Sequence, residues 1–313
     1  MTYKVLITCP PMLRQIEEFE ELFTKMDMEI TAPKMLQTLS EKQLLDIVPK
    51  HDGWIIGDDQ ANAKIFKAGV AGQLKAAVKW GIGVDNVDFS ACKRLGIPII
   101  NTPNMFGAEV ADLALCYLLG LARDAFYIDR EVRAGNWPKP AGISLKGKTV
   151  GIVGLGDIGL QIAKRAHAHE MNVCGWDPYV KMKISYINLS NDWPLSLNQC
   201  DFLIFACALT SENYHMFDEK IVDKLKPGVR IINVSRGSLI NEDVLLKCLE
   251  TGIVNSAALD VFEHEPLEKN HKILKHPKCI LGSHNASNTF DAVEKASVEA
   301  IRLLNKFFIQ SSK

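Results

Sequence analysis

The chain has 313 residues, of which 47% are hydrophobic and 23% charged, and its formal net charge is −1 at pH 7. This composition is that of an ordinary globular protein, and the length allows two domains with separate cores. The small net charge gives no electrostatic reason to expect binding to nucleic acid or to an anionic membrane surface. No apolar run approaches the roughly 18–20 residues that span a bilayer.

The cysteines are scattered among mostly apolar residues, and no two form a C-x-x-C pair. This pattern predicts reduced core thiols rather than disulfides or metal ligands. The first residues have an apolar strand pattern and lack the cleavage site of a signal peptide. The sequence therefore predicts a cytoplasmic protein without a metal site. The eight cysteines stand at positions 9, 92, 116, 174, 200, 207, 248 and 279.

Short apolar runs alternate with segments of helical periodicity through the first hundred residues. Such alternation predicts βαβ units and a parallel sheet, here with a flavodoxin-like layout. Ser40 and Asp88 precede two of the helical segments and are predicted N-caps. The predicted strands are residues 5–8, 29–31, 53–56, 75–80 and 98–101, and the predicted helices are residues 11–23, 40–48, 61–68 and 88–96.

A long, mostly apolar helix is predicted at residues 107–123. It is longer and more apolar than packing on one sheet face requires. Two interpretations stay open: a core helix between domains, or a helix at the interdomain and dimer interface. Residues 130–145 contain several glycines and prolines and are predicted to form a loop.

Residues 148–159 carry an apolar, β-branched run that leads directly into G-x-G-x-x-G at Gly154, Gly156 and Gly159. In a dinucleotide site the first glycine makes the tight turn, the second lets a pyrophosphate approach the backbone, and the third lets helix pack on strand. The N-terminus of the following helix then holds the phosphates. A predicted helix at 160–169 follows, as this interpretation requires.

An acid completes this pattern. Asp177 stands at the end of the next predicted strand, residues 173–176, and 23 residues after Gly154. A carboxylate there accepts hydrogen bonds from the adenosine ribose and repels a 2′-phosphate, which favours NAD over NADP. A glycine-rich turn in an unrelated α/β protein is the alternative, but the order of strand, glycines, helix, strand and acid favours a dinucleotide.

The alternation resumes after Asp177, with predicted strands at 201–207, 230–234, 256–261 and 279–281 and predicted helices at 218–225, 242–251 and 291–308. The predicted fold class is α/β, with two doubly wound parallel-sheet domains. A Rossmann-type NAD-binding domain, residues 102–285, is inserted into a flavodoxin-like substrate domain, residues 1–101 and 286–313. Ligands of such sheets bind at the carboxyl ends of the strands, so the active site is expected in the cleft between the domains.

Reactive side chains follow three of the later strands. Arg236 comes just past one strand, Asp260 and Glu265 stand at and beyond the end of the next, and His284 follows the last. Taken singly, a loop arginine is usually solvated or ion-paired, and a loop histidine is seldom a catalyst. Together, in a sheet that binds a dinucleotide, they are predicted to converge near the nicotinamide.

With these residues in this order, the chain resembles the D-isomer-specific 2-hydroxyacid dehydrogenases, a family that includes phosphoglycerate, glycerate, glyoxylate and D-lactate dehydrogenases. The resemblance covers nearly the whole chain. It rests on motifs in family order: G-I-G-V-D-N-V-D at 81–88, N-T-P at 101–103, V-A-D at 110–112, R-A-G-N-W at 133–137, the glycine-rich stretch at 151–159, N-V-S-R-G at 233–237, L-D-V-F-E-H-E-P at 259–266, and His284.

The resemblance implies a role for each reactive residue. Arg236 would bind the substrate carboxylate and the C2 oxygen through its guanidinium fork. His284 would exchange the proton of the C2 hydroxyl while hydride passes to or from the nicotinamide. Glu265 would hold the other imidazole nitrogen and stabilise the imidazolium. The backbone N–H groups of Ile82 and Gly83 would bind the carboxylate from the other domain, and domain closure would exclude water.

The resemblance also implies the cofactor contacts. The pyrophosphate would bind at the glycine-rich turn, and the adenosine ribose would bind Asp177. The nicotinamide end of the cofactor would contact the segments around Arg236 and His284. The residues implied are Gly154, Gly156, Asp157, Ile158, Gly159, Asp177, Cys207, Ala208, Thr210, Val234, Ser235, Arg236, Asp260, His284 and Ser287.

The sequence departs from the family at residues 55–59, where phosphoglycerate-using relatives carry an arginine for the substrate phosphate. Here Asp58 and Asp59 stand instead, which argues against a phosphorylated substrate unless Lys79 or another base substitutes. Asn285 and Ser287 replace the usual small residues after the histidine and add hydrogen-bonding capacity near the nicotinamide or substrate.

The predicted protein is thus an NAD-dependent oxidoreductase of small D-2-hydroxy or 2-keto acids, acting as a homodimer without nucleic-acid or membrane partners. Formate and phosphite dehydrogenases share the fold, but formate dehydrogenases carry Gln where Glu265 stands. An NAD-sensing transcriptional corepressor of the same fold is the alternative outside enzymes, since such corepressors keep the three catalytic residues.

Overall fold

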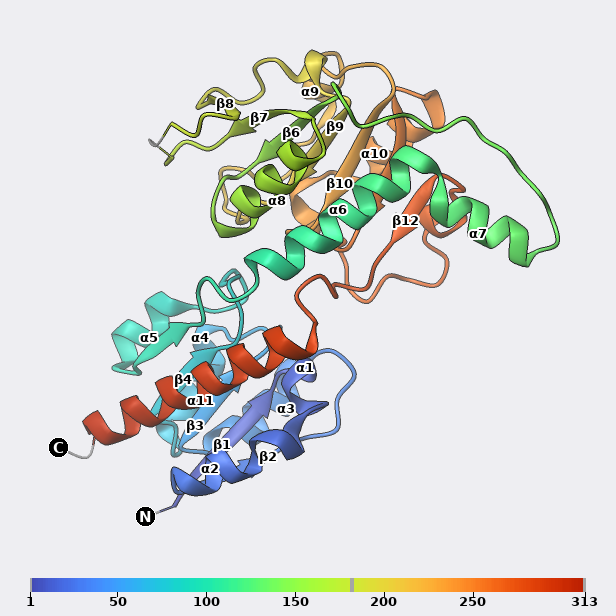
Figure 1. The fold of residues 1–313 in the computed structure, drawn as a ribbon. Helices are drawn as coiled ribbons and strands as arrows, with labels where there is room; N and C mark the ends of the chain where they lie inside the picture. Colours follow the sequence, from blue (N-terminus) through green and yellow to red (C-terminus); the bar gives the residue numbers. More distant parts are fainter. Residues whose placement is uncertain (1, 181–182, 312–313) are drawn as a thin grey trace. The chain divides into compact units, whose positions relative to one another are not determined.

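The computed structural model of the protein describes residues 2–180 and 183–311 (Figure 1). They form two compact units. The first runs to Phe106 and resumes at Ser287, and the second is Gly107–Ala286. Over the described ranges, no helix combines the length and apolar character needed to cross a membrane.

The first unit is built on a five-stranded parallel sheet in the order β2-β1-β3-β4-β5, the flavodoxin-like order. Strands β3 and β4 are buried at every position, as expected for a sheet covered on both faces. The strands are β1 Tyr3–Thr8, β2 Met28–Thr31, β3 Gly53–Ile56, β4 Ala76–Lys79 and β5 Ile99–Asn101; the helices are α1 Pro10–Leu13, α2 Glu20–Lys25, α3 Glu41–Ile47, α4 Ala63–Ala71, α5 Phe89–Leu95 and α11 Phe290–Ser311.

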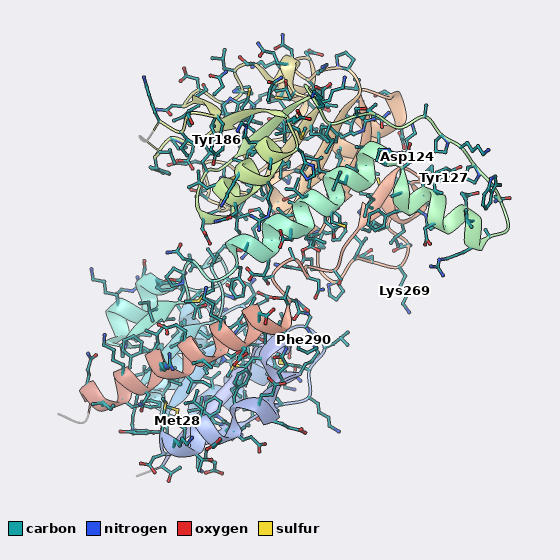
Figure 2. The ribbon with its side chains drawn as sticks, viewed as in Figure 1. Met28, Asp124, Tyr127, Tyr186, Lys269 and Phe290 are labelled. Atoms are coloured by element: carbon teal, nitrogen blue, oxygen red, sulfur yellow. The ribbon has the colours of Figure 1, made fainter. Side chains whose placement is uncertain are left out.

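The last helix, α11, belongs to this first unit and packs on β3 and β4 (Figure 1). A Cβ added at Gly53 would lie 2.7 Å from Phe308 Cζ and 2.9 Å from Leu304 Cδ2. The missing side chain of β3 therefore lets the buried face of α11 approach the sheet closely. Phe290, at the start of the helix, is exposed (Figure 2).

The sequence-predicted caps are confirmed in this unit. Ser40 and Gln43 form a reciprocal capping box at the start of α3, and the Asp88 carboxylate accepts a hydrogen bond from Ala91 N at 2.7 Å. The continuous helix predicted at 11–23 is wrong. Gln15 leaves helical geometry (φ −118°, ψ 20°), so α1 and α2 are separated by a 3₁₀ turn at Ile16–Phe19 although the apolar periodicity continues.

The second unit is built on a seven-stranded parallel sheet in the order β12-β11-β10-β9-β6-β7-β8. The chain enters at β6, builds outward to β8, and then returns to continue from β9 to β12, which is the doubly wound order of a Rossmann fold. The strands are β6 Thr149–Val153, β7 Asn172–Trp176, β8 Ile187–Ser190, β9 Phe202–Phe205, β10 Val229–Asn233, β11 Val254–Leu259 and β12 Cys279–Leu281; the helices are α6 Gly107–Arg123, α7 Ala125–Arg133, α8 Asp157–Ala168, α9 Glu219–Val222 and α10 Glu242–Thr251.

Two elements of this unit differ from the sequence prediction. Helix α7 extends to Arg133, into the predicted loop, because the glycines and prolines that end it come only later. Strand β8 was not predicted. Tyr186, just before it, stacks on His167 of α8 with ring centroids 4.6 Å apart, a long-range contact that sequence periodicity does not reveal (Figure 2).

The boundary between the units falls after Phe106 and not after residue 101 as predicted. Phe106 packs against Trp80 with ring centroids 5.1 Å apart, and Thr102 Oγ1 accepts a hydrogen bond from Gly81 N at 2.8 Å. These contacts tie residues 102–106 to the first sheet. The return into the first unit at Ser287 is one residue later than predicted.

Candidate active site

The ends of β10, β11 and β12 form one edge of the second sheet. The three strands are neighbours and parallel, with Asn233 opposite Leu259 and Leu259 opposite Leu281. The loop after β10 carries Arg236, the loop after β11 carries Glu265, and the loop after β12 carries His284. Parallel pairing thus brings three chemically reactive loops to the carboxyl edge, where ligands of such sheets bind.

His284 and Glu265 form a direct pair. His284 Nδ1 lies 2.7 Å from Glu265 Oε2, and the two side chains are 25% and 24% exposed. The other oxygen of Glu265 accepts a hydrogen bond from Phe262 N at 2.9 Å. Because a carboxylate only accepts, it favours the imidazole tautomer with its proton on Nδ1. His284 Nε2 is then the nitrogen that can take up or release a proton.

The backbone at His284 is held in the left-handed region, with φ at 55°. A non-glycine residue rarely adopts this conformation, and such outliers concentrate at functional sites. Two contacts with Asp260 hold the segment. His284 N donates to the carbonyl of Asp260 at 2.6 Å, and Ala286 N donates to its carboxylate Oδ2 at 2.8 Å.

The carboxylate of Asp260 is buried, with the residue 1% exposed. Its second oxygen accepts a hydrogen bond from the Tyr117 hydroxyl of α6 at 3.3 Å. Burial, with the nearby charge of Asp260, raises the pKa of Tyr117, so this hydroxyl stays protonated and can donate. A Cβ at Gly282 would lie 2.1 Å from Asp260 Oδ1. Both oxygens of Asp260, which the resemblance placed at the nicotinamide, are therefore bonded within this unit.

Arg236 lies in a turn that is held by hydrogen bonds of the Asn233 side chain. The Asn233 amide donates to the carbonyl of Arg236 at 2.8 Å and accepts from Ser235 N at 3.1 Å. Arg236 Nη1 donates to the carbonyl of Ser235 at 2.9 Å. A Cβ at Gly237 would lie 1.9 Å from the carbonyl carbon of Phe262. The arginine turn and the Glu265 loop are therefore in backbone contact.

A network outside the predicted site anchors the Glu265 loop to α10. Glu263 N donates to Glu242 Oε1 at 2.7 Å, and Glu242 N donates to Glu263 Oε1 at 2.9 Å. His215 Nε2 lies 3.0 Å from Glu263 Oε2, and Asn241 Nδ2 lies 3.4 Å from His215 Nδ1. The Asn241 oxygen caps Val244 N, so its amide nitrogen faces His215. His215 then carries its proton on Nε2 and donates it to Glu263.

His271 extends the same network. Its Nδ1 accepts from Ile273 N at 3.4 Å, and its Nε2 lies 3.2 Å from Glu242 Oε2. Burial raises the pKa of the Glu242 carboxyl. Among the described residues, no group of three or more His, Cys, Asp or Glu is arranged to hold a metal ion. The network's evident effect is to fix the loop that carries Glu265.

The glycine-rich turn has the geometry that a dinucleotide requires. Gly154 has φ at 90°, and a Cβ there would lie 2.6 Å from Cys207 Cα. A Cβ at Gly159 would lie 1.9 Å from the carbonyl oxygen of Gly154, so the start of α8 packs directly on the turn. No heavy atom lies within 4 Å of the corresponding position at Gly156, the N-cap residue of α8. A pyrophosphate can therefore approach the helix N-terminus at this point.

Asp177 joins the end of β7 to this turn. Its Oδ2 accepts from Leu155 N at 2.8 Å, and its Oδ1 accepts from Tyr179 N at 2.8 Å. Oδ1 also accepts from Val180 N at 3.2 Å, so Oδ2 is the oxygen with further acceptor capacity for a ribose hydroxyl. Asp157 opens α8, and its carboxylate lies against Gly107, where an added Cβ would be 2.4 Å from both oxygens. Asp157 and Ile158 can therefore bind a phosphate only through their backbone N–H groups.

The loop after β9 contains Cys207, Ala208 and Thr210. Ser235 Oγ donates to the carbonyl of Cys207. Asn213, which sequence reasoning missed, donates to the Ala208 carbonyl and accepts from Thr210 N, both at 2.7 Å. Burial raises the pKa of the Cys207 thiol to about 11. Beside the glycine-rich turn, this loop therefore presents a neutral thiol and a fixed backbone.

Three of the predicted site residues belong to the first unit. Ile82 and Gly83 follow β4 in a turn where Asn101 Nδ2 donates to the Ile82 carbonyl at 3.1 Å. In the part of the chain that the structure describes, the N–H groups of Ile82 and Gly83 have no acceptor. Both can therefore donate to an anion. Ser287 begins the return segment of this unit, and its carbonyl accepts from Thr289 N.

The chain matches known proteins over most of its length. Residues 115–286 match the family described as "D-isomer specific 2-hydroxyacid dehydrogenase, NAD binding domain". The chain is 31% identical to the hydroxypyruvate reductase of Thermotoga maritima, covering 93% of this chain and 94% of that one. It is 32% identical to D-3-phosphoglycerate dehydrogenase 2, chloroplastic, of Arabidopsis thaliana, over 83% of this chain.

The chain spans only 42% of the length of that Arabidopsis relative and 49% of the D-3-phosphoglycerate dehydrogenase of Archaeoglobus fulgidus. Among solved structures, the TT0316 protein of Thermus thermophilus has a TM-score of 0.84 at 26% identity, covering 98% of this chain and 97% of that one. The D-lactate dehydrogenase of Escherichia coli has the same fold, with a TM-score of 0.83 at 24% identity, over 98% of this chain and 97% of that one.

Gly156→Ala and Gly159→Ala should both weaken NADH binding, but only Gly159→Ala should also lower the melting temperature. We expect Gly159→Ala to lower the melting temperature and to weaken NADH binding, because its methyl group would strike the Gly154 carbonyl. Gly156→Ala should keep the melting temperature and still weaken NADH binding at least about tenfold, since its methyl would block only the phosphate. Thermal melts and fluorescence titration with NADH measure both. Equal NADH affinity of Gly156→Ala and wild type would contradict a phosphate site at this turn.

Proposed function

Because the chain belongs to the D-isomer specific 2-hydroxyacid dehydrogenase family, we propose that it is an NAD-dependent oxidoreductase of small D-2-hydroxy and 2-keto acids. The observation that carries the proposal is the His284–Glu265 pair, 2.7 Å apart, on loops at the same sheet edge as Arg236. A proton-exchanging group and a carboxylate-binding group at this edge are what hydride transfer at C2 of a hydroxy acid requires.

The residues divide the chemistry among them. When bound, NAD supplies the hydride acceptor, and NADH the hydride donor. Arg236 binds the substrate carboxylate and the C2 oxygen, and the N–H groups of Ile82 and Gly83 bind the carboxylate from the first unit. During reduction His284 Nε2 gives a proton to the C2 oxygen, and during oxidation it takes that proton back. Glu265 holds Nδ1–H and stabilises the imidazolium form.

The cofactor site follows from the glycine-rich turn and Asp177. The open space at Gly156 and the N-terminus of α8 fit a pyrophosphate, and the carboxylate of Asp177 fits the ribose hydroxyls. The same carboxylate would repel a 2′-phosphate, which favours NAD over NADP. Cys207, Ala208 and Thr210 would face the adenosine, while Val234, Ser235 and Ser287 would line the nicotinamide end.

We further propose a cytoplasmic homodimer. Support for the location comes from the eight cysteines, which are all free thiols, as a reducing compartment keeps them. Support for a dimer comes from apolar side chains on α6 and α7 that stay partly exposed: Leu119 is 38% exposed, Phe126 37% and Val132 41%. A second copy that covers these helices would bury them.

The direct test is NADH oxidation with a panel of 2-keto acids, from glyoxylate and hydroxypyruvate to branched and aromatic ones. We expect turnover with at least one small keto acid, and a loss of about a hundredfold or more in kcat for a His284→Ala variant that still binds NADH. Absorbance at 340 nm follows the reaction. NADH binding without turnover of any keto acid would contradict the enzyme and favour the corepressor-like alternative.

A second test addresses Glu265. Glu265→Gln keeps an acceptor for Phe262 N but removes the negative charge beside His284. The imidazolium becomes less stable, so the fall of kcat/KM for keto-acid reduction with rising pH should begin about one pH unit lower. Glu268→Gln, on the same loop and exposed, is the matched control and should leave the profile in place. An unchanged profile for Glu265→Gln would remove Glu265 from the proton relay.

A further inference from the structure

His215 joins the loop after β9 to the loop that carries Glu265. Its Nε2 lies 3.0 Å from Glu263 Oε2, and the two side chains are 24% and 20% exposed. Glu263 stands two residues before Glu265, whose carboxylate accepts from Phe262 N. A charge-assisted hydrogen bond that is largely shielded from solvent is stronger than one on an open surface. His215 therefore restrains the Glu265 loop through Glu263.

Three further contacts fix His215 itself. Its backbone N–H donates to the carbonyl of Ser238 at 2.8 Å, just after the arginine turn. The ring of Tyr214 stacks on the imidazole, with centroids 4.0 Å apart and an angle of 25° between the planes. Asn241, the N-cap of α10, directs its amide nitrogen at His215 Nδ1, 3.4 Å away. Because an amide nitrogen can only donate, the proton of the imidazole stays on Nε2, which faces Glu263.

The same loop carries the residues that are proposed to face the adenosine. Asn213, two residues before His215, donates to the Ala208 carbonyl and accepts from Thr210 N, both at 2.7 Å. Met216 N donates in turn to the Asn213 carbonyl at 3.0 Å. The backbone on the adenosine side and the residue that holds Glu263 thus belong to one hydrogen-bonded turn.

We propose that His215 is a positioning residue for the proton relay: through Glu263 it couples the adenosine-side loop to the Glu265 loop, so that binding of the adenosine half of the cofactor restrains the Glu265–His284 pair. The inference rests on the proposed function, because it needs the adenosine at the loop after β9 and proton exchange at His284. A Cβ at Gly237 would lie 2.4 Å from Glu263 N, so the loop has little room to absorb a shift of Glu263 before it reaches Glu265.

The direct test uses ADP, which carries the adenosine and the pyrophosphate but neither the second ribose nor the nicotinamide. The amides of residues 262–265 report opening of the Glu265 loop, and bound ADP should slow their hydrogen exchange at least about threefold in the wild type. His215→Met removes the donor, so there the slowing should disappear while ADP still binds. His215→Gln keeps an N–H donor for Glu263 and should keep the slowing.

Mass spectrometry of the exchanged peptides follows these amides, and calorimetric titration measures ADP binding to each variant. Equal slowing in the wild type and in His215→Met would overturn the inference and leave the proposed function standing. Absence of slowing in wild-type protein that binds ADP would do the same. If the wild type bound no ADP, the proposed cofactor site would fail, and the inference with it.

A second set of variants tests the bond without changing His215. In Glu263→Gln the side-chain oxygen still accepts from Glu242 N, so the new amide N–H group faces the N–H of His215 Nε2. We expect kcat to fall about tenfold while NADH affinity stays within about twofold of the wild type. Adding Asn241→Asp lets the imidazole proton move to Nδ1 and bond the new carboxylate, so that Nε2 accepts from the amide. This double variant has the net charge of the wild type and should regain most of the lost kcat.

The matched control adds Asn198→Asp to Glu263→Gln. Asn198 is exposed in the turn Leu197–Gln199, at the amino end of β9 and so away from His215, and its change restores the net charge alone. It should leave kcat as low as in Glu263→Gln. Equal recovery of kcat with either addition would overturn the inference, and so would a wild-type kcat in Glu263→Gln.

Discussion

The carboxylate and carbonyl of Asp260 together hold the end of β12 against the end of β11. The carbonyl accepts from His284 N, and the carboxylate accepts from Ala286 N and the Tyr117 hydroxyl. Asp260 is 1% exposed, and burying a carboxylate costs folding free energy unless its oxygens accept hydrogen bonds. The donors from Ala286 and Tyr117 therefore offset the cost of burying this group. The left-handed backbone of His284, and with it the pairing to Glu265, depends on this one buried group.

The rest of the site follows the logic of a parallel sheet. Neighbouring parallel strands deliver their loops to one edge, so residues far apart in the sequence meet without any long connection across the unit. Main-chain groups build the turn at the start of α8 that we propose binds the phosphates, and side chains after β10, β11 and β12 are the ones proposed to supply the acid–base and carboxylate-binding chemistry. Glu263 and Glu242 then fix the Glu265 loop to α10, because the backbone N–H of each donates to the side-chain carboxylate of the other.

Local pattern was enough to predict both parallel sheets, the glycine-rich turn, the caps at Ser40 and Asp88, and the strand ends that carry the candidate catalytic residues. Each depends on residues close in sequence or on the period of apolar positions. The Tyr117–Asp260 bond joins residues 143 positions apart, and no spacing predicts it. A tyrosine inside an apolar helix was the available signal, because a buried hydroxyl needs a partner.

The Glu263 network and strand β8 were missed for the same reason: their partners come from distant segments. The broken helix at Gln15 shows the opposite error, since apolar periodicity persists through a 3₁₀ turn and hides the break. At the first sheet, the sequence showed two acids and a lysine, and only the fold shows that Asp58 and Lys79 are paired.

The central claim is that hydride passes between the cofactor and C2 of a D-2-hydroxy acid at the His284 edge of the second sheet. It is tested most directly with NADH deuterated at both C4 positions of the nicotinamide and a small 2-keto acid, followed by mass spectrometry and chiral analysis of the product. The account predicts one deuterium at C2 of the D-enantiomer. A product without deuterium, or the L-enantiomer, would contradict it.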